Sequence, residues 1–357
     1  MYELMNRTDR FHLYYLILNN VREEEFQGLA HVAEHTMLFP GERILRFSGK
    51  GYTYLNHVCL YYTCDSLDVL TEVDGQIWSG KAITNSNVCC AKQQVIEEIN
   101  CMAKQTQKNL QIVDFITDGR INQLSMGTVE QVKKIQTNDI LKWFCEKKQN
   151  GHIYRYLFQD AHNMILSTPL STTLSFSSES TKQKEVAAIT GDCRFHTNLS
   201  AHSSVKVYLK IPVIYRKEDQ LQKAFFEYCI QRKLEEDLNI DTLITDEYFE
   251  YNERYSALYF QIATPEKVVE ILGRIRHAIA NVSLTEFTKY KAEFELLKPV
   301  LIKSEETNFD IINKKKNWIL YRIPQIETKD WEMIKFISYE LFPGTWIADA
   351  PLRIVMK

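Results

Sequence analysis

The segment that most constrains this chain is residues 28–41, GLAHVAEHTMLFPG. In a helix, His31 and His35 lie four positions apart and Glu34 lies three from His31, so the three side chains share one face. Two imidazoles at this spacing can bind one metal ion, and a carboxylate beside that metal can take a proton from water. The segment therefore predicts hydrolytic metal chemistry. The alternative is a surface helix whose histidines align by chance.

The motif is the inverted zinc signature H-x-x-E-H, and residues 28–39 resemble the pitrilysin and insulin-degrading-enzyme family, which includes the mitochondrial processing peptidases. The resemblance is to the small bacterial two-domain members. In that family a glutamate from a later helix is the third ligand, in a pattern like V-x-x-E-[IL], and VIEEI at 95–99 matches it. The resemblance implies a Zn²⁺ site made by His31, His35 and Glu98, with Glu97 as the fallback.

The segment that contains Glu98 also has the residue pattern of a helix. Apolar residues recur at helical spacing over 85–104, and Glu98 lies beside that stripe, where a carboxylate needs water or a cation. Two features depart from the family. The gap of 63 positions between His35 and Glu98 is shorter than usual, which indicates trimmed loops. Many members also carry a glutamate seven positions before the third ligand. Here that position is Ala91, which predicts the loss of a supporting carboxylate and a slower turnover.

The resemblance also implies a substrate-binding residue. Family members carry a glycine and then an asparagine on a strand that lines the cleft, and Gly51 and Asn56 match these in place. The next residue is usually small in the family but is His57 here, which narrows the cleft or adds a polar contact. A strand asparagine with an ordinary structural role is the alternative.

Composition excludes several classes of protein. The chain has 357 residues, 45% apolar and 25% charged, which is enough for two domains with sizeable cores. A net charge of -3, with no basic block beyond the lysines at 314–316, argues against nucleic-acid binding. No apolar run is long enough for a membrane span and no secretory signal is recognisable, so we expect a cytoplasmic protein. Eight cysteines without C-x-x-C spacing are expected to be reduced.

We expect three parts along the chain. Residues 1–166 form the zinc-binding catalytic domain, the Ser/Thr-rich stretch 167–185 is a linker, and residues 186–357 form a second, related domain without catalytic residues. The expected class is α+β, with a mostly antiparallel sheet in each domain covered by helices on one face. Strands are predicted at 11–19, 153–158, 205–213, 248–251 and 256–264, and helices at 219–238, after Pro265, after a capping box at 283–286, and at 307–321 and 328–341.

The second half lacks a pair of residues that the family uses. In the family, a C-terminal domain of the same chain or of a partner supplies an arginine and, seven positions on, a tyrosine. Glu235 and Thr242 stand in these places here, with Arg232 and Tyr248 as nearby substitutes. The resemblance therefore implies a heterodimer whose partner supplies the Arg/Tyr pair.

Together these expectations describe a Zn²⁺-dependent endopeptidase with Glu34 as catalytic base. An extended peptide would pair with an edge strand of the first domain. By analogy, the chain is expected to be the catalytic subunit of a heterodimer that cleaves leader segments and matures a ribosomally made peptide such as a bacteriocin. Two alternatives stay open: a catalytically weak or silent peptide-binding scaffold subunit, and a metal-binding module that does not hydrolyse peptides.

Overall fold

The structure is a computed structural model, and its residues fall into two compact units. It describes residues 10–38, 47–116, 125–159, 162–165, 204–211, 217–238, 243–250, 253–263, 268–297, 308–321, 328–342, 344 and 352–356. The first unit comprises Met1–Gln111, Ile121–Ser180 and Glu306–Lys316, and the second comprises Ile112–Arg120, Thr181–Glu305 and Asn317–Lys357. The predicted linker over 167–185 lies outside the described residues.

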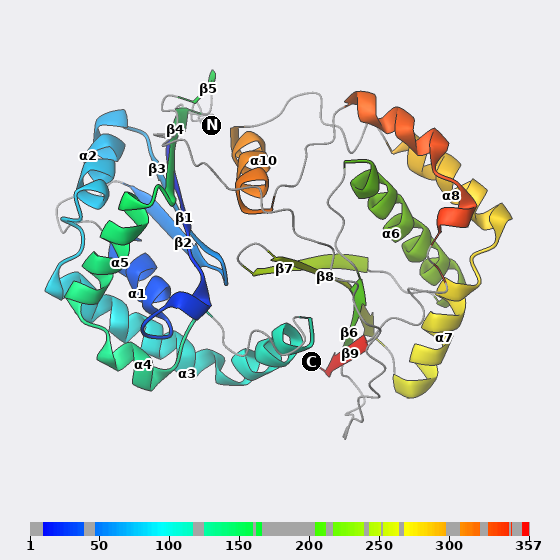
Figure 1. The fold of residues 1–357 in the computed structure, drawn as a ribbon, viewed down its shortest axis with the longest axis horizontal. Coiled ribbons are helices and arrows are strands. Elements are labelled where there is room, and N and C mark those ends of the chain that lie inside the picture. The colour runs from blue at the N-terminus through cyan, green and yellow to red at the C-terminus, as the bar shows by residue number, and fades with distance from the viewer. Residues whose placement is uncertain are drawn as a thin grey trace, which may run out of the picture. The chain divides into compact units, whose positions relative to one another are not determined.

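The first unit is built on a five-stranded antiparallel sheet in the order β2-β3-β1-β4-β5 (Figure 1). The strands are β1 (Phe11–Leu18), β2 (Ser48–Thr53), β3 (His57–Cys64), β4 (Ile153–Gln159) and β5 (His162–Ile165). The strands predicted over 11–19 and 153–158 are confirmed as β1 and β4. Strand β1, rich in aromatic and aliphatic residues, lies between β3 and β4 and pairs with both.

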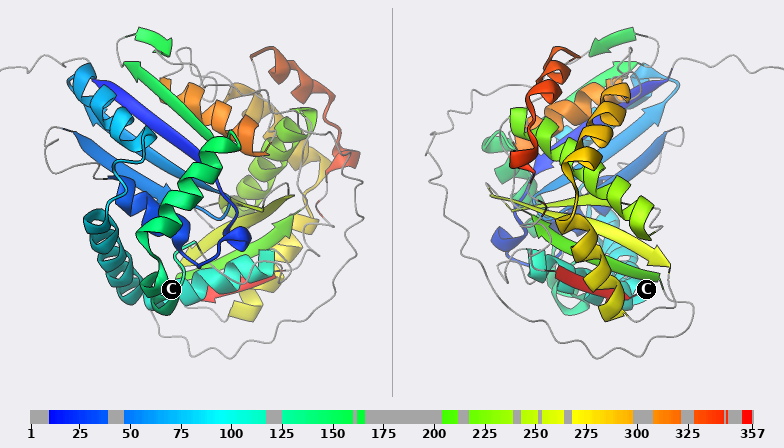
Figure 2. Two further views of the ribbon diagram at one scale, coloured as in Figure 1. Left: turned by 60° about the vertical axis from the view of Figure 1, so that its left-hand side comes forward. Right: turned by 90° about the vertical axis from the view of Figure 1, so that its right-hand side faces the viewer.

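Helices cover one face of this sheet. They are α1 (Leu29–Leu38), α2 (Leu67–Trp78), α3 (Asn85–Ile116), α4 (Val129–Lys134) and α5 (Thr137–Gln149), with a short 3-10 helix η1 (Val21–Glu23) before α1. Tyr15 of β1 and Tyr62 of β3 share one apolar core with Val73 of α2, Val95 of α3 and Phe144 of α5. Figure 2 shows α2 and α5 against the strands from a second direction.

The opposite face of the central strand is also buried. Tyr14 and Leu16 are 4% and 0% exposed, although neither belongs to the core under the helices. Helix α10 (Asn308–Tyr321) begins in the first unit, and Lys315 Nζ lies 5.7 Å from the centre of the Tyr156 ring on that face. The sequence predicted a covering of helices on one face, so this second contact, made by a distant part of the chain, was not anticipated.

The second unit has a four-stranded antiparallel sheet in the order β7-β8-β6-β9. Its elements are β6 (Ser204–Ile211), α6 (Lys217–Leu238), β7 (Leu243–Glu250), β8 (Glu253–Ala263), α7 (Val268–Ala280), α8 (Leu284–Leu296), the 3-10 helices η2 (Thr328–Phe336) and η3 (Tyr339–Leu341), and β9 (Leu352–Met356). Phe225 of α6 packs against Phe287 and Phe294 of α8 in its core. The helix predicted over 328–341 is confirmed and takes the form of the two 3-10 helices η2 and η3.

Two negative findings concern the described residues only. No helix among them is both long and apolar enough to cross a membrane. None of the cysteines among them forms a disulfide; three are buried (Cys59, Cys64 and Cys229) and four are exposed (Cys89, Cys90, Cys101 and Cys145).

Helix α8 begins at the predicted capping box. Ser283 Oγ accepts a hydrogen bond from the Glu286 N–H at 3.2 Å, and the Glu286 carboxylate accepts one from the Ser283 N–H at 2.7 Å. Lys233 Nζ of α6 lies 2.6 Å from Glu286 Oε1. Burial raises the pKa of Glu286, but hydrogen bonds from Lys233 and Ser283 outweigh burial and lower the pKa to about 2.

We expect Glu286→Gln to destabilise the chain by about 1 kcal/mol at neutral pH, since the ion pair with Lys233 is lost. Because the folded pKa is depressed, the stabilisation is present above pH 4.5 and is lost as the pH falls toward about 2. Urea unfolding near pH 7 and near pH 2.5 tests this, with exposed Glu295→Gln on the same helix as the control. Equal destabilisation at both pH values would contradict the assignment.

Candidate metal centre and active site

The start of helix α1 is fixed by a partly buried hydrogen-bond network. Glu24 Oε2 accepts from the N–H groups of Gly28 and Leu29 at 3.0 Å each, and Asn19 Nδ2 donates to Glu24 Oε1 at 2.7 Å. Gly28 has a φ of 88°, and a Cβ there would lie 2.6 Å from the Met126 carbonyl oxygen. Only glycine fits this left-handed position without strain. The chain therefore enters the motif helix in a single defined geometry.

Helix α1 is a core helix, not a surface one. Every residue of it except His35 is buried, which overturns the alternative of a surface helix with chance histidines. His31 is 8% exposed and Glu34 is 3% exposed. Because polar groups are costly to bury unless they are satisfied, the partners of these side chains determine what the site can do.

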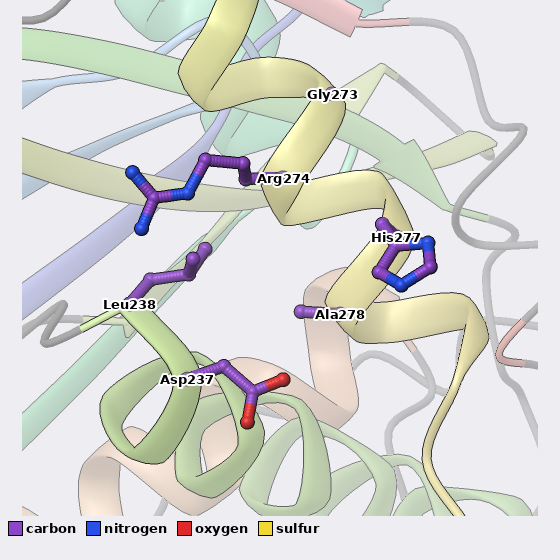
Figure 3. Close-up of a pocket in the computed structure, with 6 residues that line it drawn as sticks. All are labelled: Asp237, Leu238, Gly273, Arg274, His277 and Ala278. Atoms are coloured by element: carbon purple, nitrogen blue, oxygen red, sulfur yellow. The ribbon is translucent and has the colours of Figure 1, made fainter.

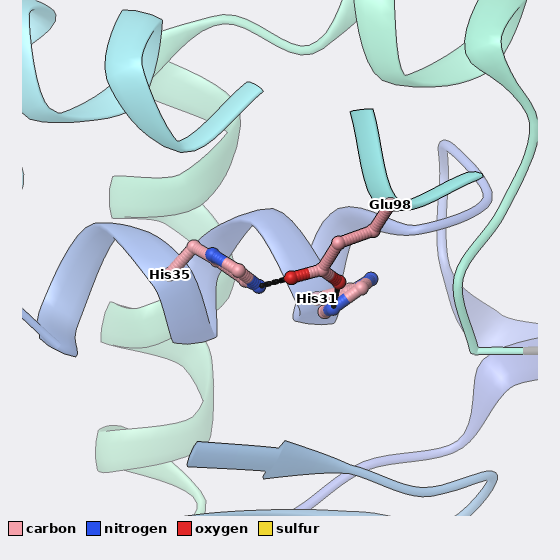
Figure 4. A group of neighbouring side chains, drawn as sticks. All are labelled: His31, His35 and Glu98. Atoms are coloured by element: carbon pink, nitrogen blue, oxygen red, sulfur yellow. Dashed lines mark ion pairs between the residues drawn. The ribbon is translucent and has the colours of Figure 1, made fainter. Parts of the chain in front are cut away.

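Helix α3 brings Glu98 to both imidazoles. Glu98 Oε2 lies 3.3 Å from His31 Nε2, and Glu98 Oε1 lies 3.4 Å from His35 Nε2 (Figure 4). Within the part of the chain that the structure describes, these three residues are the one group of metal-ligating side chains close enough to share an ion, with donor atoms within 4.8 Å of one another. The fallback residue Glu97 is exposed and accepts from Gln93 instead.

The chemistry of this donor set fits zinc. Two ligands about 2.1 Å from a tetrahedral zinc ion lie about 3.4 Å apart, close to the 3.3 and 3.4 Å found between the carboxylate and the imidazoles. Burial and the neighbouring His35 lower the pKa of His31 to about 4, so this imidazole is neutral near pH 7. Two imidazoles and one carboxylate leave a fourth coordination position, as catalytic zinc sites do.

Strand β2 holds the Glu34 carboxylate from the other side. Thr53 Oγ1 donates to Glu34 Oε2 at 2.7 Å. A Cβ on Gly51 would lie 2.1 Å from Glu34 Oε1, so the strand can approach the carboxylate this closely only with glycine there. Burial raises the pKa of Glu34, while the hydrogen bond from Thr53 lowers it. Nothing in the sequence marked Thr53, because a threonine on a strand is an ordinary residue.

Asn56 lies in the turn between β2 and β3, not on a strand as predicted. Its side chain is 6% exposed and its Oδ1 lies 2.8 Å from His57 Nδ1, while its backbone carbonyl accepts from the Asn19 N–H at 2.9 Å. His57 is itself buried and stacks against Tyr54 with ring centres 4.4 Å apart. Substrate binding by Asn56 stays a prediction.

The two histidines differ in the hydrogen-bond partner of Nδ1, the ring nitrogen that faces away from Glu98. His35 Nδ1 lies 3.1 Å from Gln94 Oε1, whereas His31 Nδ1 is buried and has no hydrogen-bond partner among the described residues. Ala91 is 1% exposed and packs in the apolar core. Gln94 was not predicted, although its place four positions before Glu98, on the same helix face, could have drawn attention to it.

Arg232, the nearby substitute for the arginine of the family, already pairs with carboxylates of its own unit. The Arg232 guanidinium pairs with Glu235 at 2.9 Å and with Glu236 and Glu293 at 3.1 Å each. Its donors are therefore used within the unit, which removes Arg232 as a substitute for the arginine of the family. Tyr248 lies on β7, and Thr242 lies outside the described residues.

An open depression of about 630 Å³ lies between α6 and α7 (Figure 3). It is lined by Asp237, Leu238, Gly273, Arg274, His277 and Ala278. Asp237 pairs with Lys233 Nζ at 3.1 Å, and His277 Nδ1 lies 3.2 Å from Asn281 Nδ2. Because both groups already have partners, this depression offers no acid–base pair comparable to the site on α1.

The mixed helix-and-sheet fold is similar to that of several solved structures, among them M16-type proteins. No family model matches the sequence, and no curated protein matches it. Among solved structures, the periplasmic protease PqqL from Escherichia coli matches with a TM-score of 0.68 and 13% identity over 96% of this chain, which spans 44% of PqqL.

Two further structures are similar over most of both chains. An M16-like peptidase from Alicyclobacillus acidocaldarius has a TM-score of 0.60 and 12% identity, covering 97% of this chain and 92% of its own. A peptidase M16 inactive domain from Pseudomonas fluorescens has a TM-score of 0.60 and 11% identity, again covering 97% and 92%. At these identities the likeness shows the fold, which active and inactive proteins share, so the function must be argued from the site.

We expect the purified chain to bind one zinc ion and Glu98→Ala to weaken zinc binding by about 100-fold or more, because one of three ligands is lost. Competition with a chromophoric chelator measures the affinity. Glu97→Ala is the matched control, since this neighbouring carboxylate is exposed and lies outside the cluster. Equal loss in both variants would rule out Glu98 as a specific ligand.

Proposed function

We propose that this chain is a zinc-dependent endopeptidase. The observation that carries the proposal is the closeness of His31, His35 and Glu98, whose donor atoms lie within 4.8 Å of one another. The buried Glu34 carboxylate lies on the helix of the two histidines and accepts a hydrogen bond from Thr53. When bound, zinc would polarise the scissile carbonyl and lower the pKa of water. The M16-type fold supports this reading and does not by itself establish it.

Glu34 is the proposed general base and acid. Its carboxylate takes a proton from the attacking water, whose oxygen bonds to the carbonyl carbon of the substrate. The proton then passes from Glu34 to the amine nitrogen as the C–N bond breaks, which leaves a carboxylate and an amine. Thr53 and Gly51 keep the carboxylate in place for both transfers, because one donates to it and the other leaves room for it.

Strand β2 is the proposed docking strand for substrate. It lies at the edge of the described sheet and pairs there with β3 alone. An extended peptide can add to such an edge through backbone hydrogen bonds. Because Gly51 and Thr53 of β2 contact Glu34, a peptide on this edge would lie near the catalytic carboxylate. This docking mode selects extended peptides and unfolded segments over folded proteins.

We further propose that the chain is one half of a heterodimer that cleaves leader segments from ribosomally made peptides such as bacteriocins. The absence of the Arg/Tyr pair from the expected positions supports this, since Glu235 stands in one of them and pairs with Arg232. The cytoplasmic location likewise stays a prediction. A chain that cleaves well without any partner would overturn the heterodimer.

We expect Glu34→Gln to keep zinc and to lower peptide cleavage by about 1000-fold, because the amide cannot accept the proton. The measurement is cleavage of a peptide library by wild type and variant, each alone and together with the product of a neighbouring gene. A catalytically silent scaffold would show no cleavage in any of these mixtures. That outcome, with zinc bound, would overturn the peptidase proposal.

We expect Gly51→Ala to lower cleavage by about 100-fold with little change in stability or zinc content, because the three atoms nearest the new Cβ all belong to the Glu34 side chain and none to the backbone. Gly75→Ala is the control, since a Cβ on this exposed helical glycine meets no described atom within 4 Å. Thermal melts and metal analysis accompany the assay. Unchanged activity in Gly51→Ala would show that the contact with Glu34 has no role.

A further inference from the structure

The amide of Gln94 makes the one described side-chain contact to the far nitrogen of a proposed metal ligand. Gln94 Oε1 lies 3.1 Å from His35 Nδ1, while the other ring nitrogen, Nε2, faces Glu98. If Nε2 is the nitrogen that binds a metal, Nδ1 must carry the hydrogen and must donate it. The Gln94 carbonyl oxygen is placed to accept that hydrogen.

Gln94 and Glu98 lie four positions apart on α3, so their side chains share one face of the helix. One helix therefore supplies both the third ligand and the acceptor that orients the second ligand. The contact is sheltered, because the His35 side chain is 12% exposed and Gln94 is half-buried. An ordered acceptor of this kind fixes both the tautomer and the ring orientation of a histidine ligand.

No other described group does this for either histidine. Ala91, one turn earlier on the same face of α3, packs in the apolar core and has no side-chain acceptor. His31 Nδ1 is buried without a partner among the described residues. Among the described residues, Gln94 is thus the one whose side chain contacts the second ring nitrogen of a proposed ligand. A substitution of Gln94 should therefore lower the zinc affinity more than a substitution of a neighbouring residue.

We propose that Gln94 is a positioning residue that holds His35 in the metal-binding tautomer and thereby sets the zinc affinity of the chain. The inference rests on the proposed zinc site. The proposal predicts the direction in which zinc affinity changes, because a neutral amide is a weaker hydrogen-bond acceptor than a carboxylate. Gln94→Glu should keep or strengthen zinc binding, whereas Gln94→Met, which has a similar size but only a weak thioether acceptor, should weaken it.

The experiment measures zinc affinity of the full chain by competition with a chromophoric chelator. Gln94→Met should weaken binding by about 10- to 100-fold, and Gln94→Glu should equal or exceed wild type. Gln93→Met is the matched control, since Gln93 is exposed and donates to Glu97 at 2.8 Å, away from the cluster. The visible spectrum of the Co²⁺-substituted chain gives a second readout of ligand geometry.

The outcomes separate this inference from the function on which it rests. A wild-type chain that binds no zinc overturns the proposed function and this inference with it. If the wild type binds zinc and Gln94→Met binds it with the same affinity, this inference is overturned and the proposed function is not. Equal weakening by Gln94→Met and Gln94→Glu shows that only packing matters and also overturns it. If Gln94→Met fails to fold, the comparison of Gln94→Glu with wild type decides, and weaker binding contradicts the proposal.

Discussion

The site depends on placing the His31 imidazole and the Glu34 carboxylate inside an apolar core, with the half-buried His35 imidazole on the same helix. Helix α1 is enclosed on nearly all sides, and His31 and Glu34 are almost inaccessible to water. Buried polar groups persist only where their surroundings satisfy them. Glu98 satisfies the two imidazoles from α3, and Thr53 satisfies Glu34 from β2. Helix α3 and strand β2 thus each contact a different part of the same cluster.

In this arrangement the side chains that could share a cation are distinct from the carboxylate that is proposed to transfer a proton. The donor atoms of His31, His35 and Glu98 face one another, so they can share a cation. Glu34 instead faces β2, where a glycine and a threonine define its position. A carboxylate that is held by the protein and not by the metal is free to accept and return a proton. The proposed metal binding and the proposed proton transfer can therefore be disrupted independently.

Much of the fold was predictable because it follows from local periodicity. Strand β1 and the helices α1 and α6 were expected from their apolar patterns, and the capping box at Ser283 marked the start of α8. The contact of α10 with the first sheet was not, since it joins segments far apart in the chain. The helix expected over 328–341 is present as two 3-10 helices, a helix type that periodicity alone does not reveal.

The candidate site shows the same limit. The H-x-x-E-H spacing pointed to His31 and His35, the resemblance to the family pointed to Glu98, and the structure brings the three side chains together. Residues that only hold another side chain in position match no motif in the sequence. Thr53 and Gln94 are ordinary polar residues in the sequence, and only the meeting of elements shows what they contact. The position of Asn56 in a turn likewise depends on where β2 ends, which the motif did not specify.

A crystal structure of the zinc-loaded chain, with anomalous data on both sides of the zinc edge, tests the account most directly. The account predicts one anomalous peak about 2.0–2.1 Å from Nε2 of His31 and of His35 and about 2.0–2.2 Å from a Glu98 oxygen. A peak elsewhere in the chain, or no peak with these side chains ordered, would contradict it.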